Sequence, residues 1–139
     1  MNATIEETLN AVKCVGMETV IGAPDLTIDH VMQARSRIAP YVHNTPILTS
    51  TYLNERIGAE LFFKCENFQK AGAFKVRGAC NAVFGLTDED AVHGVATHSS
   101  GNHALSLSYA AGRRGIPCHV VMPKTAPQAK KDAVLGYGG

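Results

Sequence analysis

The sequence predicts an α/β fold, in which helices flank an open parallel sheet. In the last third of the chain, short apolar runs alternate with longer helical patterns in the order strand, helix, strand, helix. This order is typical of parallel strands joined by right-handed crossover helices. The composition agrees, because 45% of the 139 residues are hydrophobic, enough for the core of one ordinary domain.

The N-terminal region is predicted to hold an extension followed by a helix. Residues 1–26 are weakly patterned, and a short helix is expected from Ile5 to Val15. Thr27 is a typical N-cap, so a second helix should begin there and end near Pro40. The apolar stripe of this second helix comprises Ile28, Val31, Met32 and Ile38.

The middle of the chain should hold an extended segment, a short helix, a strand and a longer helix. Thr45 precedes a proline, which favours extended backbone, and residues 49–51 can cap a short helix that ends near Gly58. The apolar run ELFFKCE, residues 60–66, is predicted to be a buried strand. A loop and a helix follow, and residues 88–94 form a polar connection. The apolar face of that helix comprises Val76, Ala79, Cys80, Val83 and Phe84.

The last third contains the strand and helix alternation that fixes the fold class. Residues 93–98 should form a short strand, and a helix over residues 104–114 should end at Gly115. Residues 116–123 read as a buried strand, and residues 125–138 as a helix with a proline in its first turn. The double glycine at the end is a turn signal rather than a usual domain end, so we expect the chain to be truncated.

Composition argues against several classes of protein. The formal net charge of +1 gives no sign of a nucleic-acid or membrane-binding surface, and no apolar run is long enough to span a bilayer. The first residues lack the basic and apolar blocks of a secretory signal, so a cytoplasmic location is expected. No CxxC pair exists, so the cysteines should be reduced and mostly buried thiols. They are Cys14, Cys65, Cys80 and Cys118.

A short polar loop, SSGNH at residues 99–103, lies between a predicted strand and a predicted helix. Ligands bind at the carboxyl ends of the strands in open α/β sheets, and a helix N-terminus offers unpaired N–H groups to an anion. Gly101 would let the backbone approach that ligand closely. Ordinary capping explains the same residue types equally well, so this motif alone leaves both interpretations open.

Lys75 in the stretch NFQKAGAFKVRGAC lies at the junction of a loop and an apolar helix. The ordinary interpretation is a solvated lysine. The chemical interpretation rests on the aromatic Phe74 beside it and on the positive charges of Lys70 and Arg77, which would lower an ammonium pKa in a desolvated site. A neutral amine is what Schiff-base chemistry requires.

Taken together, the pattern KxGxFKxRGA at residues 70–79 and the loop SSGNH resemble the fold-type II pyridoxal-phosphate enzymes. The sequence is most similar to the serine racemase and serine/threonine dehydratase group. Supporting matches are TPILTS at 45–50, LFFKCENFQK at 61–70 and GIPCHVVMPKTAP at 115–127. The resemblance covers residues 26–139 and implies the N-terminal portion of a two-domain, tryptophan synthase β-like enzyme. Residues 27–90 would then belong to the large domain, and residues 91–139 would begin the small domain.

The resemblance also implies roles for individual residues. Lys75 matches the lysine that forms the aldimine with pyridoxal 5'-phosphate and transfers the Cα proton. Phe74 matches the residue that flanks the cofactor ring, and Asn102 the one that binds its 3′-oxygen. Ser100 matches the racemase serine on the opposite face of the cofactor, where many threonine dehydratases carry alanine. The loop that holds the substrate carboxylate matches Ser99, Ser100, Gly101, Asn102 and His103.

The related racemases also bind ATP and a divalent metal such as Mg²⁺. Residues at or near the matching nucleotide positions are Ser50, Thr51, Tyr52, Lys70, Lys130 and Tyr137. Ala71 and Leu105 replace a threonine and a glutamine near that site, which weakens the case for ATP. Ala73 replaces the serine usual before the Phe-Lys pair. The phosphate-binding loop, the residue that contacts the pyridine nitrogen and the acidic metal ligands lie further along the family's chain, so the isolated 139 residues should bind cofactor weakly or not at all.

The favoured hypothesis is a racemase or ammonia-lyase that acts at Cα of serine, threonine or a similar hydroxy amino acid. Its partners would be a small amino-acid substrate and, for the full-length protein, a second copy in a homodimer, without nucleic acid or membrane. The alternative is a catalytically inactive truncated product or a partner-binding fragment. A metal-binding module is disfavoured, because the six histidines lack the spacing of metal ligands.

Overall fold

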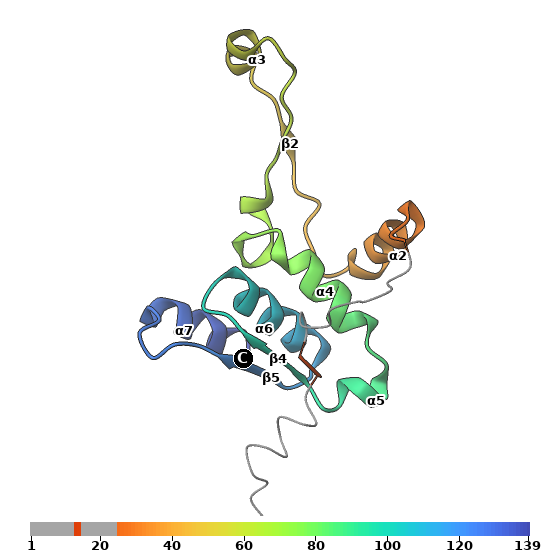
Figure 1. Ribbon diagram of the computed structural model, residues 1–139, viewed down its shortest axis with the longest axis vertical. Helices are drawn as coiled ribbons and strands as arrows, with labels where there is room; N and C mark the ends of the chain where they lie inside the picture. The colour runs from red at the N-terminus through yellow and green to blue at the C-terminus, as the bar shows by residue number, and fades with distance from the viewer. Residues whose placement is uncertain (1–12, 15–24) are drawn as a thin grey trace, which may run out of the picture.

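The computed structural model describes residues 13–14 and 25–139 (Figure 1). The strands are β1 (Lys13–Cys14), β2 (Ile47–Leu48), β3 (Phe63–Lys64), β4 (Val95–His98) and β5 (Cys118–Val121). The α-helices are α2 (Ile28–Ile38), α3 (Thr51–Ile57), α4 (Lys75–Gly85), α5 (Asp88–Ala91), α6 (Asn102–Arg114) and α7 (Gln128–Gly136). Two 3-10 turns precede α4, namely η1 (Glu66–Phe68) and η2 (Lys70–Gly72).

The predicted parallel sheet is confirmed. Its strand order is β1-β4-β5, and both pairings are parallel, with Val95 opposite Lys13 on one side and Cys118 on the other. Helix α6 connects β4 to β5, which is the crossover that parallel strands need. Because β4 is the central strand, its residues Val95–Thr97 are buried.

The core lies where α4 packs along α6 above the sheet (Figure 1). The predicted apolar face of α4 is confirmed, since Val76, Cys80 and Val83 are fully buried and meet Leu107 of α6. Phe84 is partly buried and stacks on Tyr41 with ring centroids 3.6 Å apart. This core crosses the expected domain boundary at residues 90–91, and the division into large and small domains stays a prediction.

Local signals place the helix ends well. Thr27 caps α2 and forms a capping box with His30, and the Ser50 hydroxyl accepts a hydrogen bond from the N–H of Leu53 at the start of α3. Gly58 and Gly115 end α3 and α6 in the left-handed conformation that glycine adopts at least cost. These caps agree with the predicted boundaries.

The predicted burial of ELFFKCE is wrong. The run ELFFKCE yields only the two-residue strand β3, which pairs antiparallel with β2 in an arm that projects from the core and ends in α3 (Figure 1). Phe62 is 68% exposed there, because within the described residues no layer packs over the arm. In the apolar stripe of α2 only Ile38 enters the core, while Ile28, Val31 and Met32 remain exposed.

Strand β5 is buried on one face only. Cys118 is buried and Val120 half-buried on one side, while His119 and Val121 are exposed on the other. The predicted buried strand is therefore exposed on its outer face, because covering that face would need a second layer, which the described part of the chain does not supply at this edge strand.

Smaller differences concern two connections. Residues 88–94, expected to be a polar link, contain the short helix α5, which Thr87 caps. The expected helix from Ile5 to Val15 lies outside the described residues except for Lys13–Cys14, which form strand β1 instead.

Among the helices that the structure describes, none is long and apolar enough to cross a membrane.

Candidate active site

Lys75 is the first residue of α4, at the end of an irregular segment that includes η1 and η2. Its side chain is exposed, and its Nζ atom lies 5.3 Å from the centroid of the Phe74 ring. This geometry is a cation–π contact when the amine is protonated. Phe74 is itself 60% exposed, so the pair presents an amine and an aromatic face to the surroundings.

The SSGNH loop connects the end of β4 to the start of α6. The N-cap position of α6 is Gly101, which has no side chain to satisfy the first N–H groups, and no acidic residue lies in the first turn. These N–H groups and the helix dipole therefore favour an anion. The Ser99 hydroxyl accepts a hydrogen bond from the N–H of Gly101 at 3.2 Å, which fixes the loop. Nothing lies within 4 Å of a Cβ built on Gly101, so the backbone faces open space.

The fold brings these two stretches to the same end of a helix pair. Helices α4 and α6 pack side by side with their N-terminal ends on the same side of the molecule (Figure 1), and η2 also contacts α6. Lys75 and Phe74 thus lie at the N-terminal end of one helix, and residues 99–103 at that of its neighbour. An amine, an aromatic ring and a set of unpaired N–H groups can together receive an anionic, aldehyde-bearing aromatic molecule.

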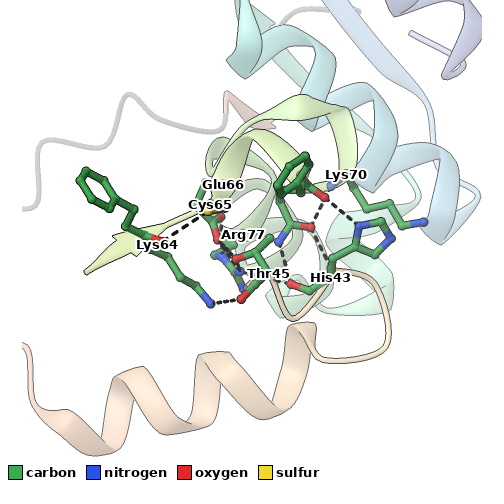
Figure 2. A network of polar contacts seen from close by, with 10 residues as sticks. His43, Thr45, Lys64, Cys65, Glu66, Lys70 and Arg77 are labelled. Atoms are coloured by element: carbon green, nitrogen blue, oxygen red, sulfur yellow. Dashed lines mark hydrogen bonds and ion pairs between the residues drawn. The ribbon is translucent and has the colours of Figure 1, made fainter. Parts of the chain in front are cut away.

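A polar network joins the segment before β2 to η1 and to the first turn of α4, the helix that begins at Lys75 (Figure 2). Arg77 donates to both carboxylate oxygens of Glu66, with distances of 2.9 Å from Nε to Oε2 and 2.7 Å from Nη2 to Oε1. The hydroxyl of Thr45 donates to the same carboxylate at 2.5 Å. The hydrogen bond from Arg77 is the main cause that lowers the pKa of Glu66 to about 2. The positive charge of Arg77 is therefore balanced by Glu66 and does not act as the unpaired charge that the sequence suggested.

This network was not predicted from the sequence. Glu66 is the first residue of η1 and Arg77 is the third residue of α4, so the two do not form the i, i+3 or i, i+4 pair of a single helix. Thr45 comes from the segment before β2, and Lys64 donates from its Nζ atom to the carbonyl oxygen of Thr45 at 2.7 Å. The only local signal was the presence of a glutamate and an arginine on either side of the Lys75 turn.

The residues matched to a nucleotide site lie in three separate places. Ser50, Thr51 and Tyr52 begin α3 at the far end of the arm, and Lys70 lies in η2 (Figure 1). The other two positions, Lys130 and Tyr137, belong to α7 and its C-terminal end. The described chain does not gather these six side chains into one pocket, and the nucleotide site stays a prediction.

One groove of about 560 Å³ opens between α2 and α4. Its wall includes Val31, Ile38, Val42, Arg77 and Asn81, and none of the predicted site residues. In residues 13–14 and 25–139, no three His, Cys, Asp or Glu side chains come together in a way that could hold a metal ion.

Comparison with known proteins assigns the family. The sequence profile of the family "Pyridoxal-phosphate dependent enzyme" matches residues 38–139. A beta-hydroxyaspartate dehydratase from Paracoccus denitrificans (strain Pd 1222) is 69% identical over 113 residues, which cover 81% of this chain and 36% of the relative. A serine racemase from Oryza sativa subsp. indica is 56% identical over 112 residues, which cover 81% and 33% of the two chains.

Solved structures agree with this assignment. Serine racemase from Dictyostelium discoideum superposes with a TM-score of 0.80 at 52% identity, over 82% of this chain and 38% of that one. A threonine deaminase structure superposes with a TM-score of 0.67 at 38% identity, over 81% and 35% of the two chains. The chain spans about a third of the length of these relatives and belongs to the family of pyridoxal-phosphate-dependent enzymes.

The residues present fit part of that cofactor's chemistry. The exposed amine of Lys75 suits an aldehyde, and the ring of Phe74 offers an aromatic face next to it. The amide of Asn102 and the unpaired N–H groups at the start of α6 suit oxygen atoms that carry negative charge. These donor types match pyridoxal phosphate and the carboxylate of an amino acid.

Proposed function

We propose that this chain belongs to an enzyme that uses pyridoxal phosphate to act at Cα of a small β-hydroxy amino acid, as a dehydratase or a racemase. The observation that carries the proposal is the placement of the Lys75 amine and the SSGNH loop at the adjacent N-terminal ends of α4 and α6. The 69% identity to a beta-hydroxyaspartate dehydratase makes β-hydroxyaspartate the first substrate to test. Serine is the second, because several relatives are serine racemases.

Each side chain has a task in this proposal. The N–H groups at the start of α6 bind the substrate carboxylate and orient the Cα–H bond. When bound, pyridoxal phosphate supplies an electron sink that makes this proton acidic. Lys75 would hold the cofactor through the cofactor's aldehyde and would carry the Cα proton on one face. In elimination Lys75 would remove the Cα proton and the β-hydroxyl would take up a proton and leave as water. The enamine product would become an imine, whose hydrolysis gives a keto acid and ammonia.

Ser100 distinguishes the two reactions. Racemisation needs one group to remove the Cα proton and a second group to return a proton to the opposite face. Ser100 lies in the loop next to the α6 N-terminus with its side chain half-exposed, and we assign it the second role. The proposal also includes a cytoplasmic location and a homodimer for the longer protein. Mg²⁺ is proposed as a further ligand, and ATP as a weaker candidate because of Ala71 and Leu105.

The experiment has two parts. The longer protein is purified, incubated with excess pyridoxal phosphate and reduced with borohydride, which fixes the cofactor to a lysine as a secondary amine, and peptide mapping compares the seven lysines of this segment. Lys75 should carry most of the label, and Lys75→Arg should remove it. A separate, unreduced sample of that protein is given β-hydroxyaspartate and L-serine, and keto acid, ammonia and D-serine are measured. Ser100→Ala should lower D-serine formation more than keto acid formation. Labelling spread evenly over exposed lysines would contradict the proposal.

A further inference from the structure

We propose that Gln69 is a positioning residue for Lys75: its buried amide holds the irregular turn that sets where the Lys75 amine lies. This inference rests on the proposed role of Lys75 as the cofactor-binding lysine. Gln69 is only 4% exposed, although glutamine is usually a surface residue. It lies between η1 and η2, six positions before Lys75.

The turn after Gln69 has a backbone that needs support. Ala71 has φ 56°, and it alone among the described non-glycine residues has a positive φ. Gly72 follows with φ 67°. An alanine avoids this left-handed region because its Cβ crowds the backbone, so surrounding contacts must hold it there. Two residues later the chain reaches Phe74 and the start of α4.

The amide of Gln69 supplies such contacts on both of its ends. Its Oε1 atom accepts hydrogen bonds from the N–H of Lys70 and from the N–H of His43, each at 2.8 Å. Its Nε2 atom donates to the carbonyl oxygen of His43, also at 2.8 Å. The ring of His43 contacts the carbonyl oxygen of Phe68 through Nδ1 at 3.0 Å. The first residue of the strained turn is therefore tied to a segment 26 positions earlier in the chain.

This arrangement specifies one geometry. A buried amide whose partners are removed leaves several polar groups unsatisfied, so the turn is strongly disfavoured in any register that breaks these bonds. Between Gln69 and Lys75 the chain is further fixed by Ala73, which is 7% exposed. The position of the Lys75 amine relative to the α6 N-terminus thus depends on Gln69, which itself takes no part in the reaction.

The test uses the longer protein and compares Gln69→Met with the control Gln33→Met, which replaces an exposed glutamine of α2. Borohydride trapping with pyridoxal phosphate is measured at Lys75 and, as an internal reference, at the exposed Lys124. Gln69→Met should lower trapping at Lys75 relative to Lys124 by about tenfold, because small displacements of a reacting group have large effects on rate. Gln33→Met should behave like the wild type. Adding Ala71→Gly to Gln69→Met should restore part of the lost trapping, since glycine accepts the left-handed turn without support.

The outcomes separate this inference from the proposed function. If the wild type labels Lys75 selectively and Gln69→Met does so equally, the role of Gln69 is refuted while that of Lys75 stands. If the wild type labels its lysines evenly, the role of Lys75 is refuted first. Circular dichroism verifies the fold of each variant. Should Gln69→Met not fold, Gln69→Glu decides, because it keeps the acceptor and loses the donor to His43. Unchanged Lys75 trapping in Gln69→Glu would then overturn the inference.

Discussion

The ion pair between Glu66 and Arg77 makes a quantitative prediction about acid stability. We consider Glu66→Gln, which keeps the size of the side chain and removes its charge. Arg77 donates two hydrogen bonds to the carboxylate, and Thr45 donates a third. The substitution therefore weakens contacts that join the segment before β2 to the first turn of α4.

The magnitude follows from the pKa. Glu66 titrates near 4.5 when unfolded and near 2 in the folded protein, which corresponds to about 3 kcal/mol of stability at neutral pH. The Arg77 side chain is 32% exposed, so solvent screening reduces the expected value to about 2 kcal/mol. Because the folded pKa is lowered, this contribution is complete above pH 4.5 and is lost as the pH falls towards 2.

Urea unfolding followed by circular dichroism measures the effect. Near neutral pH, Glu66→Gln should lower the free energy of unfolding by about 2 kcal/mol, and the two curves should converge at about pH 2. Glu60→Gln is the matched control, because Glu60 is exposed, and its curve should follow the wild type throughout. A difference between Glu66→Gln and wild type that persists unchanged at the acid limit would refute the electrostatic explanation.

Two further predictions concern packing and thiol chemistry. A Cβ on Gly112 would lie 2.6 Å from the carbonyl oxygen of Tyr137, so Gly112→Ala should destabilise the protein by about 1–3 kcal/mol in thermal unfolding. A Cβ on Gly78 in α4 meets nothing within 4 Å, so Gly78→Ala should instead raise stability by up to about 1 kcal/mol. If Gly78→Ala destabilised the protein as much as Gly112→Ala, the steric explanation for Gly112 would be contradicted. Burial raises the pKa of Cys80 to about 11 and also raises that of Cys118. Iodoacetamide should therefore modify the half-buried Cys65 before these two thiols, as mass spectrometry can verify, and the reverse order would disprove it.

Sequence patterns predicted what depends on neighbouring residues. The cap at Thr27, the left-handed glycines at Gly58 and Gly115 and the buried face of α4 are all set within a few positions of the chain. The strand and helix alternation after residue 93 fixed the parallel sheet for the same reason. The predicted burial of ELFFKCE was wrong. Apolar character indicates a preference for burial, whereas burial itself requires another helix or strand to pack over the segment.

The support behind the candidate site could not be predicted, because it depends on long-range contacts. Gln69 pairs with a residue 26 positions away, and Thr45 reaches Glu66 across 21 positions. Neither separation leaves a periodic signal in a single sequence. Ala71 was noticed only as a departure from the racemase pattern, and its left-handed conformation appears only in the folded chain.

These contacts also bear on the two interpretations of Lys75, as a solvated lysine or a chemical one. Exposure does not separate them, because a cofactor-binding lysine must be reachable before the cofactor arrives. The two interpretations differ in the backbone and side-chain contacts that they require in the turn before Lys75. A lysine that is only solvated needs neither a left-handed alanine four positions earlier nor a buried amide that satisfies that turn. Strain of this kind persists where a group must be held in one place, so the scaffold around Gln69 and Glu66 favours the chemical interpretation independently of sequence similarity.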